Sequence, residues 1–412
     1  MKPHLGTIDF AWFLLSVFAV GELGAQPPRR SDAPRLAPGP ETLARLDFRP
    51  GSAFALGELG DSSAIDGLLA RPLTWLETPH FRIGTDLATL SPHELSKPRW
   101  HEIEAEAKSM GGAALLAQWR RWGLDGRWRQ LLLALHLERQ WNELECLLPP
   151  IDESSPPTGP AVDLEGRGRG CGPMLGRDAK FVVLVFAQSI DLRRFCVDFL
   201  GDDSRGSRRA DLGGNDALLY CTAEEIASGG DRDRDLLAHV TFGVIANLVD
   251  GYRGAHQPAP AWLRFGLAQS FALAIDPTAS NAETNGDANG DANERSRRSM
   301  NWWELLRRTR SDAAFGPGAR FEADIARRDL SGASREDLVR VWSYVEFLRR
   351  RDGEALGRFL FEQKDRIPSD FSKSTAEILV ERQRKNLSRI LGFADPAAFE
   401  TAWESWRVRR KP

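Results

Sequence analysis

Apolar and polar residues alternate between residues 74 and 87, which is the pattern of a half-buried strand. We expect this strand to begin after Pro79 and to place Phe81 and Ile83 on one face. From residue 99 to residue 149, apolar residues instead recur at helical spacing. The first elements predicted are therefore a strand and a long helical block.

The middle of the chain predicts a strand that is buried on both sides and then alternating elements. Residues 180–187 are a continuous run of β-branched and aromatic residues, as in a strand covered on both faces. The pattern then predicts a helix over 190–200, a strand over 217–222, and helices over 233–250 and 260–274. Residues 301–412 are helical in pattern almost throughout. This order predicts an α+β fold with a mostly helical C-terminal subdomain.

The first 25 residues have the pattern of a signal peptide. Lys2 precedes a short apolar run over residues 11–20, and the small residues Gly24 and Ala25 follow it. The run is about half the length that spans a bilayer, which favours a cleaved signal over a retained anchor. We therefore expect an exported protein, periplasmic or extracellular, with no integral membrane span after cleavage.

Composition changes suggest where the parts of the chain begin and end. Residues 26–70 are rich in Pro, Ala, Gly and Arg and are expected to be a linker. An α+β domain is expected over 71–277, with 95–150 as a helical insertion, and 301–412 form the helical subdomain. Residues 278–298 contain no large apolar side chain, and 278–300 are expected to be a disordered insertion. They lack the ligand spacing of a calcium-binding EF-hand loop.

The composition is that of a globular protein. Of 412 residues, 42% are hydrophobic and 27% are charged, with 55 Lys and Arg against 58 Asp and Glu. This excludes a wholly disordered chain, a collagen and a multispan membrane protein, and it gives no basic field for binding nucleic acid. Four cysteines are compatible with disulfides or with buried thiols, and their pairing is left open: Cys146, Cys171, Cys196 and Cys221.

Two consecutive expected helices resemble a known enzyme family. The first contains His239 followed by Val-Thr-Phe-Gly, and the second reads Pro-Ala-Trp-Leu-Arg-Phe-Gly-Leu-Ala from Pro260. This frame resembles the gluzincin metallopeptidases of the peptidase-MA-like group, whose helices carry H-E-x-x-H and P-x-W-L-x-E-G-L-A around a catalytic zinc. The residues that match the second frame are Pro260, Trp262, Leu263, Gly266, Leu267 and Ala268.

The resemblance keeps the frame but not the zinc ligands. His239 occupies the family position of the first His ligand, and Val240 that of the general base. Gly243 stands at the position of the second His ligand and Phe265 at that of the third ligand. One imidazole does not hold a catalytic zinc, which takes three protein ligands. The resemblance therefore implies a vestigial site, with neither zinc nor another cofactor and with no catalytic residues of the family.

Weaker matches occur in the order of the family along residues 75–88 and 178–412, so the resemblance implies a zincin-like domain. We therefore expect a catalytically inactive metallopeptidase homologue, a pseudo-peptidase that binds a peptide or protein in the former cleft. A purely structural envelope protein is one alternative. Another is an active hydrolase that uses His239 with other residues, for instance Glu224 or Glu225.

The vestigial positions also predict a geometry. Val240, Gly243 and Phe265 should surround His239, with Phe265 filling the space of a metal and its water. If so, the combined change Val240→Glu, Gly243→His and Phe265→Glu should raise zinc affinity.

Overall fold

The structure is a computed structural model in which residues 36–412 form one compact unit. It describes residues 38–56, 60–69, 71–110, 112–149, 174–175, 177, 179–203, 206–212, 217–227, 231–253, 259–279, 281, 301–308, 319–327, 329–330, 332–364 and 375–409. The expected signal peptide, Cys171 and most of the expected insertion at 278–300 lie outside the described residues.

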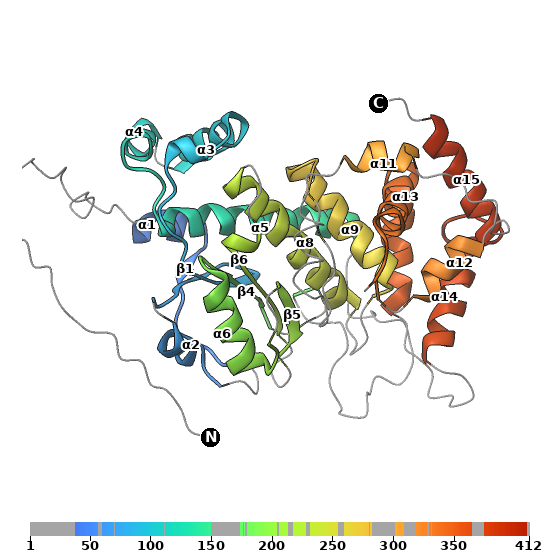
Figure 1. Cartoon of the computed structure of the whole chain (residues 1–412), viewed down its shortest axis with the longest axis horizontal. Coiled ribbons are helices and arrows are strands. Elements are labelled where there is room, and N and C mark those ends of the chain that lie inside the picture. The colour runs from blue at the N-terminus through green and yellow to red at the C-terminus, as the bar shows by residue number, and fades with distance from the viewer. Residues whose placement is uncertain are drawn as a thin grey trace, which may run out of the picture. The chain divides into compact units, whose positions relative to one another are not determined.

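Six strands form one mixed sheet in the order β1-β2-β3-β4-β6-β5 (Figure 1). The strands are β1 (Arg49–Pro50), β2 (Thr74–Glu77), β3 (Phe81–Thr85), β4 (Phe181–Phe186), β5 (Arg208–Asp211) and β6 (Leu218–Ala223). β3, β4 and β6 are parallel, whereas β1, β2 and β5 run antiparallel to their neighbours. The three parallel strands therefore end at the same edge of the sheet.

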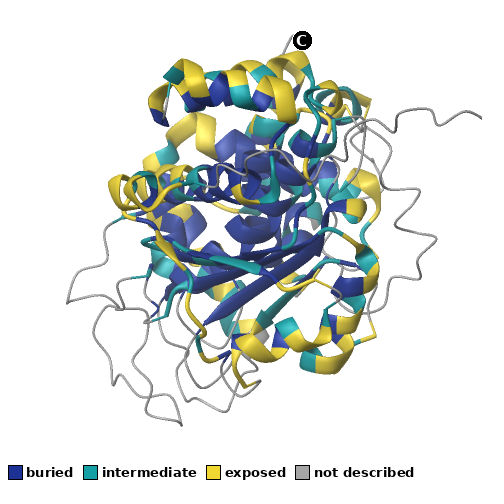
Figure 2. Cartoon of the chain, turned by 90° about the vertical axis from the view of Figure 1, so that its left-hand side faces the viewer, coloured by how far each residue is buried: buried dark blue, intermediate teal, exposed yellow. Residues whose placement is uncertain are grey.

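β4 is buried along its whole length, as its apolar run predicts. Phe181, Val183 and Val185 belong to the larger core, which also contains α5 (Gly126–Leu147) and α8 (Arg232–Arg253). The alternate side chains of β4 pack in a second core with α6 (Ser189–Leu200). Figure 2 shows the central strands of the sheet as a buried layer. The α+β fold expected from the sequence is confirmed.

α5 lies within residues 95–150, the segment expected to be a helical insertion, and it packs in the larger core. The Asp125 side chain caps this helix by accepting hydrogen bonds from the backbone N–H groups of Arg127 and Trp128. Buried Gln130 donates to the carbonyl oxygens of Thr74 (2.6 Å) and Ile83 (2.9 Å). Because Gln130 bonds to both β2 and β3, α5 is fixed directly on the sheet.

The segment expected to be a linker, 26–70, is folded where it is described. It contains α1 (Pro40–Arg45), β1 and α2 (Ser62–Leu68). Leu43, Phe48 and Ile65 are buried. Pro40 begins α1, Pro50 lies in β1 and Gly67 lies in α2, so the Pro and Gly content was a poor guide to the order of this segment.

The C-terminal helices share the core of the rest of the protein. α9 (Ala261–Ile275) packs along α13 (Arg335–Phe361), and a Cβ on Gly266 would lie 2.3 Å from a Val345 methyl carbon. Only a glycine permits so close an approach of the two helices. The helices at 301–409 therefore extend the core of residues 71–277 and do not form a core of their own.

The other helices are short or lie toward the ends of the chain. They are α3 (Lys97–Met110), α4 (Gly112–Trp122), α7 (Glu224–Ala227), α11 (Trp302–Arg308), α12 (Ala319–Ala326), α14 (Thr375–Arg389) and α15 (Pro396–Arg409), with 3-10 turns at Pro92–Glu94 and Glu362–Lys364. Among the described residues, none of these helices has the length and apolar character needed to cross a membrane.

A buried histidine between α5 and α8 makes stability depend on pH. His136 Nε2 lies 2.8 Å from Thr241 Oγ1, and burial lowers the pKa of His136 to about 3. The unfolded chain therefore binds a proton near pH 6.5 that the folded chain does not. Between about pH 6.5 and pH 3, this residue should lower the free energy of unfolding by about 1.4 kcal/mol per pH unit on acidification.

His136→Gln keeps a polar partner for Thr241 and removes this titration. We expect the variant to show a flatter fall in stability between pH 6 and pH 4, measured by urea unfolding. His93→Gln, on an exposed turn, is the matched control and should leave the pH dependence as it is. Identical pH profiles for His136→Gln and the parent would contradict the assignment.

Candidate functional site

His239 lies on α8 with both ring nitrogens hydrogen bonded. Ser207 Oγ is 2.7 Å from Nε2, and Asn281 Oδ1 is 3.0 Å from Nδ1. Because the Asn281 oxygen is an acceptor, Nδ1 carries the proton and Nε2 accepts the hydrogen bond from the Ser207 hydroxyl. The contacts therefore select one neutral tautomer of the imidazole.

The orientation of Asn281 is fixed by a second amide. Asn281 Nδ2 donates to Gln269 Oε1 (3.3 Å), and Gln269 Nε2 donates to the carbonyl oxygen of Ala279 (2.9 Å). The Trp302 indole N–H also donates to that carbonyl (2.7 Å). Asn281 and Gln269 are both buried. Because the Asn281 amide N–H donates to Gln269, the Asn281 oxygen is held toward His239.

Two more hydroxyls complete the cluster. Thr222 Oγ1 is 2.8 Å from Ser207 Oγ, and the Tyr220 hydroxyl donates to the carbonyl oxygen of His239 (3.3 Å). Burial raises the pKa of Tyr220 well above its ordinary value, although hydrogen bonds with Ser207 and Thr222 partly offset this effect. Tyr220 therefore stays protonated and remains a hydrogen-bond donor.

The sheet register brings these side chains together. Ser207 immediately precedes β5, whose first residue, Arg208, pairs with Cys221 in β6. Ser207 consequently lies beside Thr222, and α8 packs on the same strand. Sequence analysis missed β5 because its four residues are mostly charged. The charge of Arg208 is paired with Asp202 at 2.6 Å and that of Arg209 with Asp250, and Arg209 also donates to Asn247 Oδ1 at 2.7 Å.

The vestigial ligand positions are occupied by apolar groups. Val240 and Phe265 are fully buried, and the Phe265 ring packs edge-on against Phe242, with centroids 5.5 Å apart. A Cβ on Gly243 would lie 2.0 Å from a ring carbon of Tyr220. The Tyr220 ring thus occupies the space into which a second histidine ligand would extend.

The packing at Gly243 opposes the expected rise in zinc affinity of the combined variant. Gly243→His places an imidazole where the buried Tyr220 ring already lies, so the side chain cannot reach a metal without displacing β6. Phe265 lies against Phe242 and Trp302, on the same face of α9 as Gln269 one turn later. Val240 and Phe265 are both packed in the larger core.

The residues of the second family frame also have packing roles. The Pro260 carbonyl accepts the first two hydrogen bonds of α9, from Leu263 N and Arg264 N. The Trp262 indole N–H donates to Gln383 Oε1 (2.7 Å) in the interior. Leu263, Leu267 and Ala268 are fully buried, and Gly266 makes the contact with α13 described above. The frame therefore fixes α9 among its neighbouring helices.

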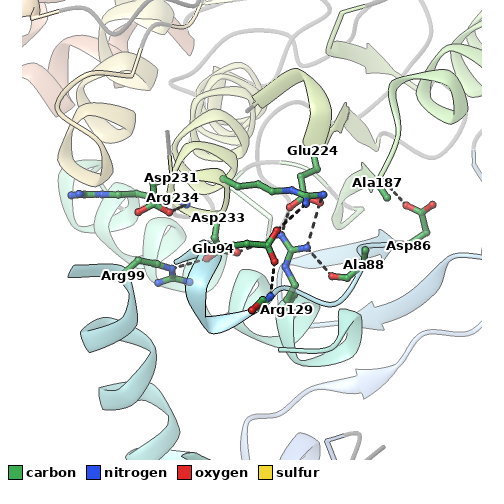
Figure 3. Close-up of polar contacts among 12 residues, drawn as sticks. Asp86, Ala88, Glu94, Arg99, Arg129, Ala187, Glu224, Asp231, Asp233 and Arg234 are labelled. Carbon is green, nitrogen blue, oxygen red and sulfur yellow. Dashed lines mark hydrogen bonds and ion pairs between the residues drawn. The ribbon is translucent and has the colours of Figure 1, made fainter. Parts of the chain in front are cut away.

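Glu224 and Glu225, the acids considered as partners of His239, are bonded elsewhere. Glu224 pairs with Arg129 and with Arg232 (2.6 Å), and Glu225 accepts from the Ser189 hydroxyl (2.7 Å). Figure 3 shows Glu224 and Arg129 within a network at the edge where the parallel strands end. Glu224 is therefore used in ion pairs, and Glu225 is used at the first residue of α6.

The same network includes a second buried acid. Asp233 accepts from Arg99 Nε (2.7 Å) and lies 3.5 Å from Arg129 Nη2. Burial by itself raises the pKa of Asp233, but the two guanidinium groups outweigh it and lower this pKa below its usual value. Among the described residues, no group of three or more His, Cys, Asp or Glu side chains is arranged to hold a metal ion.

Three of the four cysteines are described, and all three are free thiols. Cys146 is exposed, whereas Cys196 and Cys221 are buried in the core between the sheet and α6. Neither buried thiol belongs to the His239 cluster, because alternate residues of β6 point to opposite faces.

Comparison with protein-family models, with curated proteins and with solved structures finds no significant match to this chain.

Proposed function

We propose that this protein is a zinc-independent relative of the peptidase-MA-like enzymes, built on a zincin-like fold and inactive as a metallopeptidase. Its role is to bind a peptide or protein, or to support structure, in the cell envelope. The mixed sheet followed by the packed helices α8 and α9 is consistent with that fold. The retained frame and the lost ligands both support the proposal.

The observation that carries the proposal is the Tyr220 ring beside Gly243. A lost ligand alone leaves a hole that water or another donor can fill. Here the space is filled by the buried Tyr220 ring, three carbons of which would lie 2.0 to 2.4 Å from a Cβ at Gly243. A catalytic zinc ion needs three protein ligands around an open position, and the Tyr220 ring takes the space of the second histidine ligand, which supports the proposal.

We expect purified protein to contain far less than one zinc per chain after dialysis against zinc, measured by elemental analysis. A structural or catalytic zinc contributes to folded-state stability, so a chelator lowers the melting temperature of a zinc protein. Excess chelator should therefore leave the melting temperature of this protein unchanged. His239→Ala should not alter its zinc content. About one tightly held zinc per chain, lost in His239→Ala, would refute the proposal.

A second candidate is a hydrolase that uses His239 without metal. It is favoured by one observation, the hydroxyl–imidazole–amide contacts of Ser207, His239 and Asn281. Such an activity is compatible with the loss of zinc, because it needs no metal ligand.

A further inference from the structure

The His239 cluster has the geometry of a nucleophile, a base and an orienting group. A serine hydroxyl lies 2.7 Å from one ring nitrogen and an amide oxygen 3.0 Å from the other. The three residues come from three separate parts of the chain: the start of β5, the middle of α8, and the segment after α9. These are the distances at which a general base activates a hydroxyl and a third group holds the base.

We propose that Ser207 is a nucleophile for acyl transfer from carboxylic esters, with His239 as its general base and Asn281 as the positioning residue. This inference rests on the metal-independent use of His239 given above as the second candidate.

The burial of the cluster supports this assignment. Asn281 is 5% exposed and Thr222 is fully buried, whereas Ser207 and His239 keep part of their surface exposed. The orienting groups are therefore inside the protein and the reacting groups are toward its surface. A hydrogen-bond network that only stabilised the fold would not need its hydroxyl and imidazole toward the surface and its amide in the interior.

The hydrogen bonds also fix the direction of proton flow. With Nδ1–H bonded to Asn281, the lone pair of Nε2 faces the Ser207 proton. The Thr222 hydroxyl can then donate to Ser207 Oγ, since the Ser207 proton is already directed to His239. Ser207 Oγ is thereby oriented as an attacking oxygen.

The reaction balances without any co-reactant except water. Ser207 Oγ forms a bond to the ester carbonyl carbon while its proton moves to His239 Nε2. The tetrahedral oxyanion collapses, the bond to the alkoxide leaving group breaks, and the leaving oxygen takes the proton from Nε2. Water then attacks the acyl-serine, giving its proton to Nε2, and the departing Ser207 oxygen recovers that proton. The products are a carboxylic acid and an alcohol.

The amide of Asn281 favours esters over peptides as substrates. A neutral amide stabilises the imidazolium less than a carboxylate does. A weaker base suits a leaving group that departs readily. An alkoxide or phenoxide leaves more readily than an amine, so esters are the class assigned.

Covalent labelling tests the proposal directly. The full mature chain is incubated with a fluorophosphonate probe in the presence of a chelator, and labelling is followed by intact mass. We expect one adduct per chain, formed at Ser207 with loss of fluoride, and located by peptide mapping. We also expect a burst of p-nitrophenolate from p-nitrophenyl acetate. Ser207→Ala and His239→Ala should each lower the labelling rate at least about 100-fold.

The control variants separate reactivity from folding. Ser189→Ala removes a hydroxyl bonded to a carboxylate instead of an imidazole and should label at the parent rate. Asn281→Asp keeps an acceptor for Nδ1 and should retain labelling, whereas Asn281→Leu should lower it at least about tenfold when each variant is labelled well below its own melting temperature.

No labelling of folded parent protein, or an adduct mapped to another residue, would overturn the proposal. Mapping on the parent protein decides the matter even if Ser207→Ala does not fold. Zinc content is measured separately, so failure of this inference and failure of the zinc-independent assignment give different results.

Discussion

Replacing Glu224 with glutamine is expected to lower the free energy of unfolding by about 3 kcal/mol, because it leaves a buried guanidinium without its main counter-charge. The Arg129 side chain is 1% exposed and that of Glu224 is 0% exposed. Arg129 also donates to the carbonyl oxygen of Ala88 (2.9 Å), which holds it in place and prevents it from turning to water. Because glutamine has the size of glutamate, the decrease in the free energy of unfolding measures the loss of the charge and not the creation of a cavity.

Urea unfolding at neutral pH measures this effect, and Glu225→Gln is its control. Glu225 is the neighbouring residue but is near the surface, so its loss should cost less than about 1 kcal/mol. The double variant Arg129→Met/Glu224→Gln should be more stable than Glu224→Gln alone, because the charge left without a partner is gone. Equal stability of Glu224→Gln and the parent would show that Arg129 is adequately paired by Asp233.

Hydrophobic periodicity predicted the elements that carry the core. The apolar run at 180–187 and the helical spacing at 233–250 gave β4 and α8 with boundaries shifted by only a few residues. Both elements are long and bury most of their side chains, so their patterns are strong. β5 was missed because its charged residues hide a strand whose stability comes from pairing with β6 and from ion pairs of its arginines.

The candidate site was only half predictable. His239 could be singled out because a known frame surrounds it, and its neighbours on α8 follow from helical spacing. Ser207 and Asn281 are 32 and 42 residues from His239 in the chain, and neither lies in a pattern that indicates chemistry. Their approach depends on the β5–β6 register and on the amide contact with Gln269, which no local pattern encodes.

Gly243→Ala is expected to destabilise the protein by about 3 kcal/mol, although alanine is the better helix former by about 1 kcal/mol. The added carbon would lie 2.0 Å from the Tyr220 ring, far inside contact distance. Tyr220 is held by its strand and by the His239 carbonyl, so it cannot move away easily. The cost of the clash should therefore exceed the gain in helix propensity.

Gly67→Ala is the matched control, because Gly67 lies in α2 and a Cβ there meets nothing within 4 Å. It should raise stability by up to about 1 kcal/mol. In a Tyr220→Leu background the cost of Gly243→Ala should fall below about 1 kcal/mol, since the ring is gone. If Gly243→Ala is as harmless as Gly67→Ala, the second ligand position is open, and the main argument against a zinc site at His239 fails. If the cost follows the Tyr220 ring, the metal position is closed by packing.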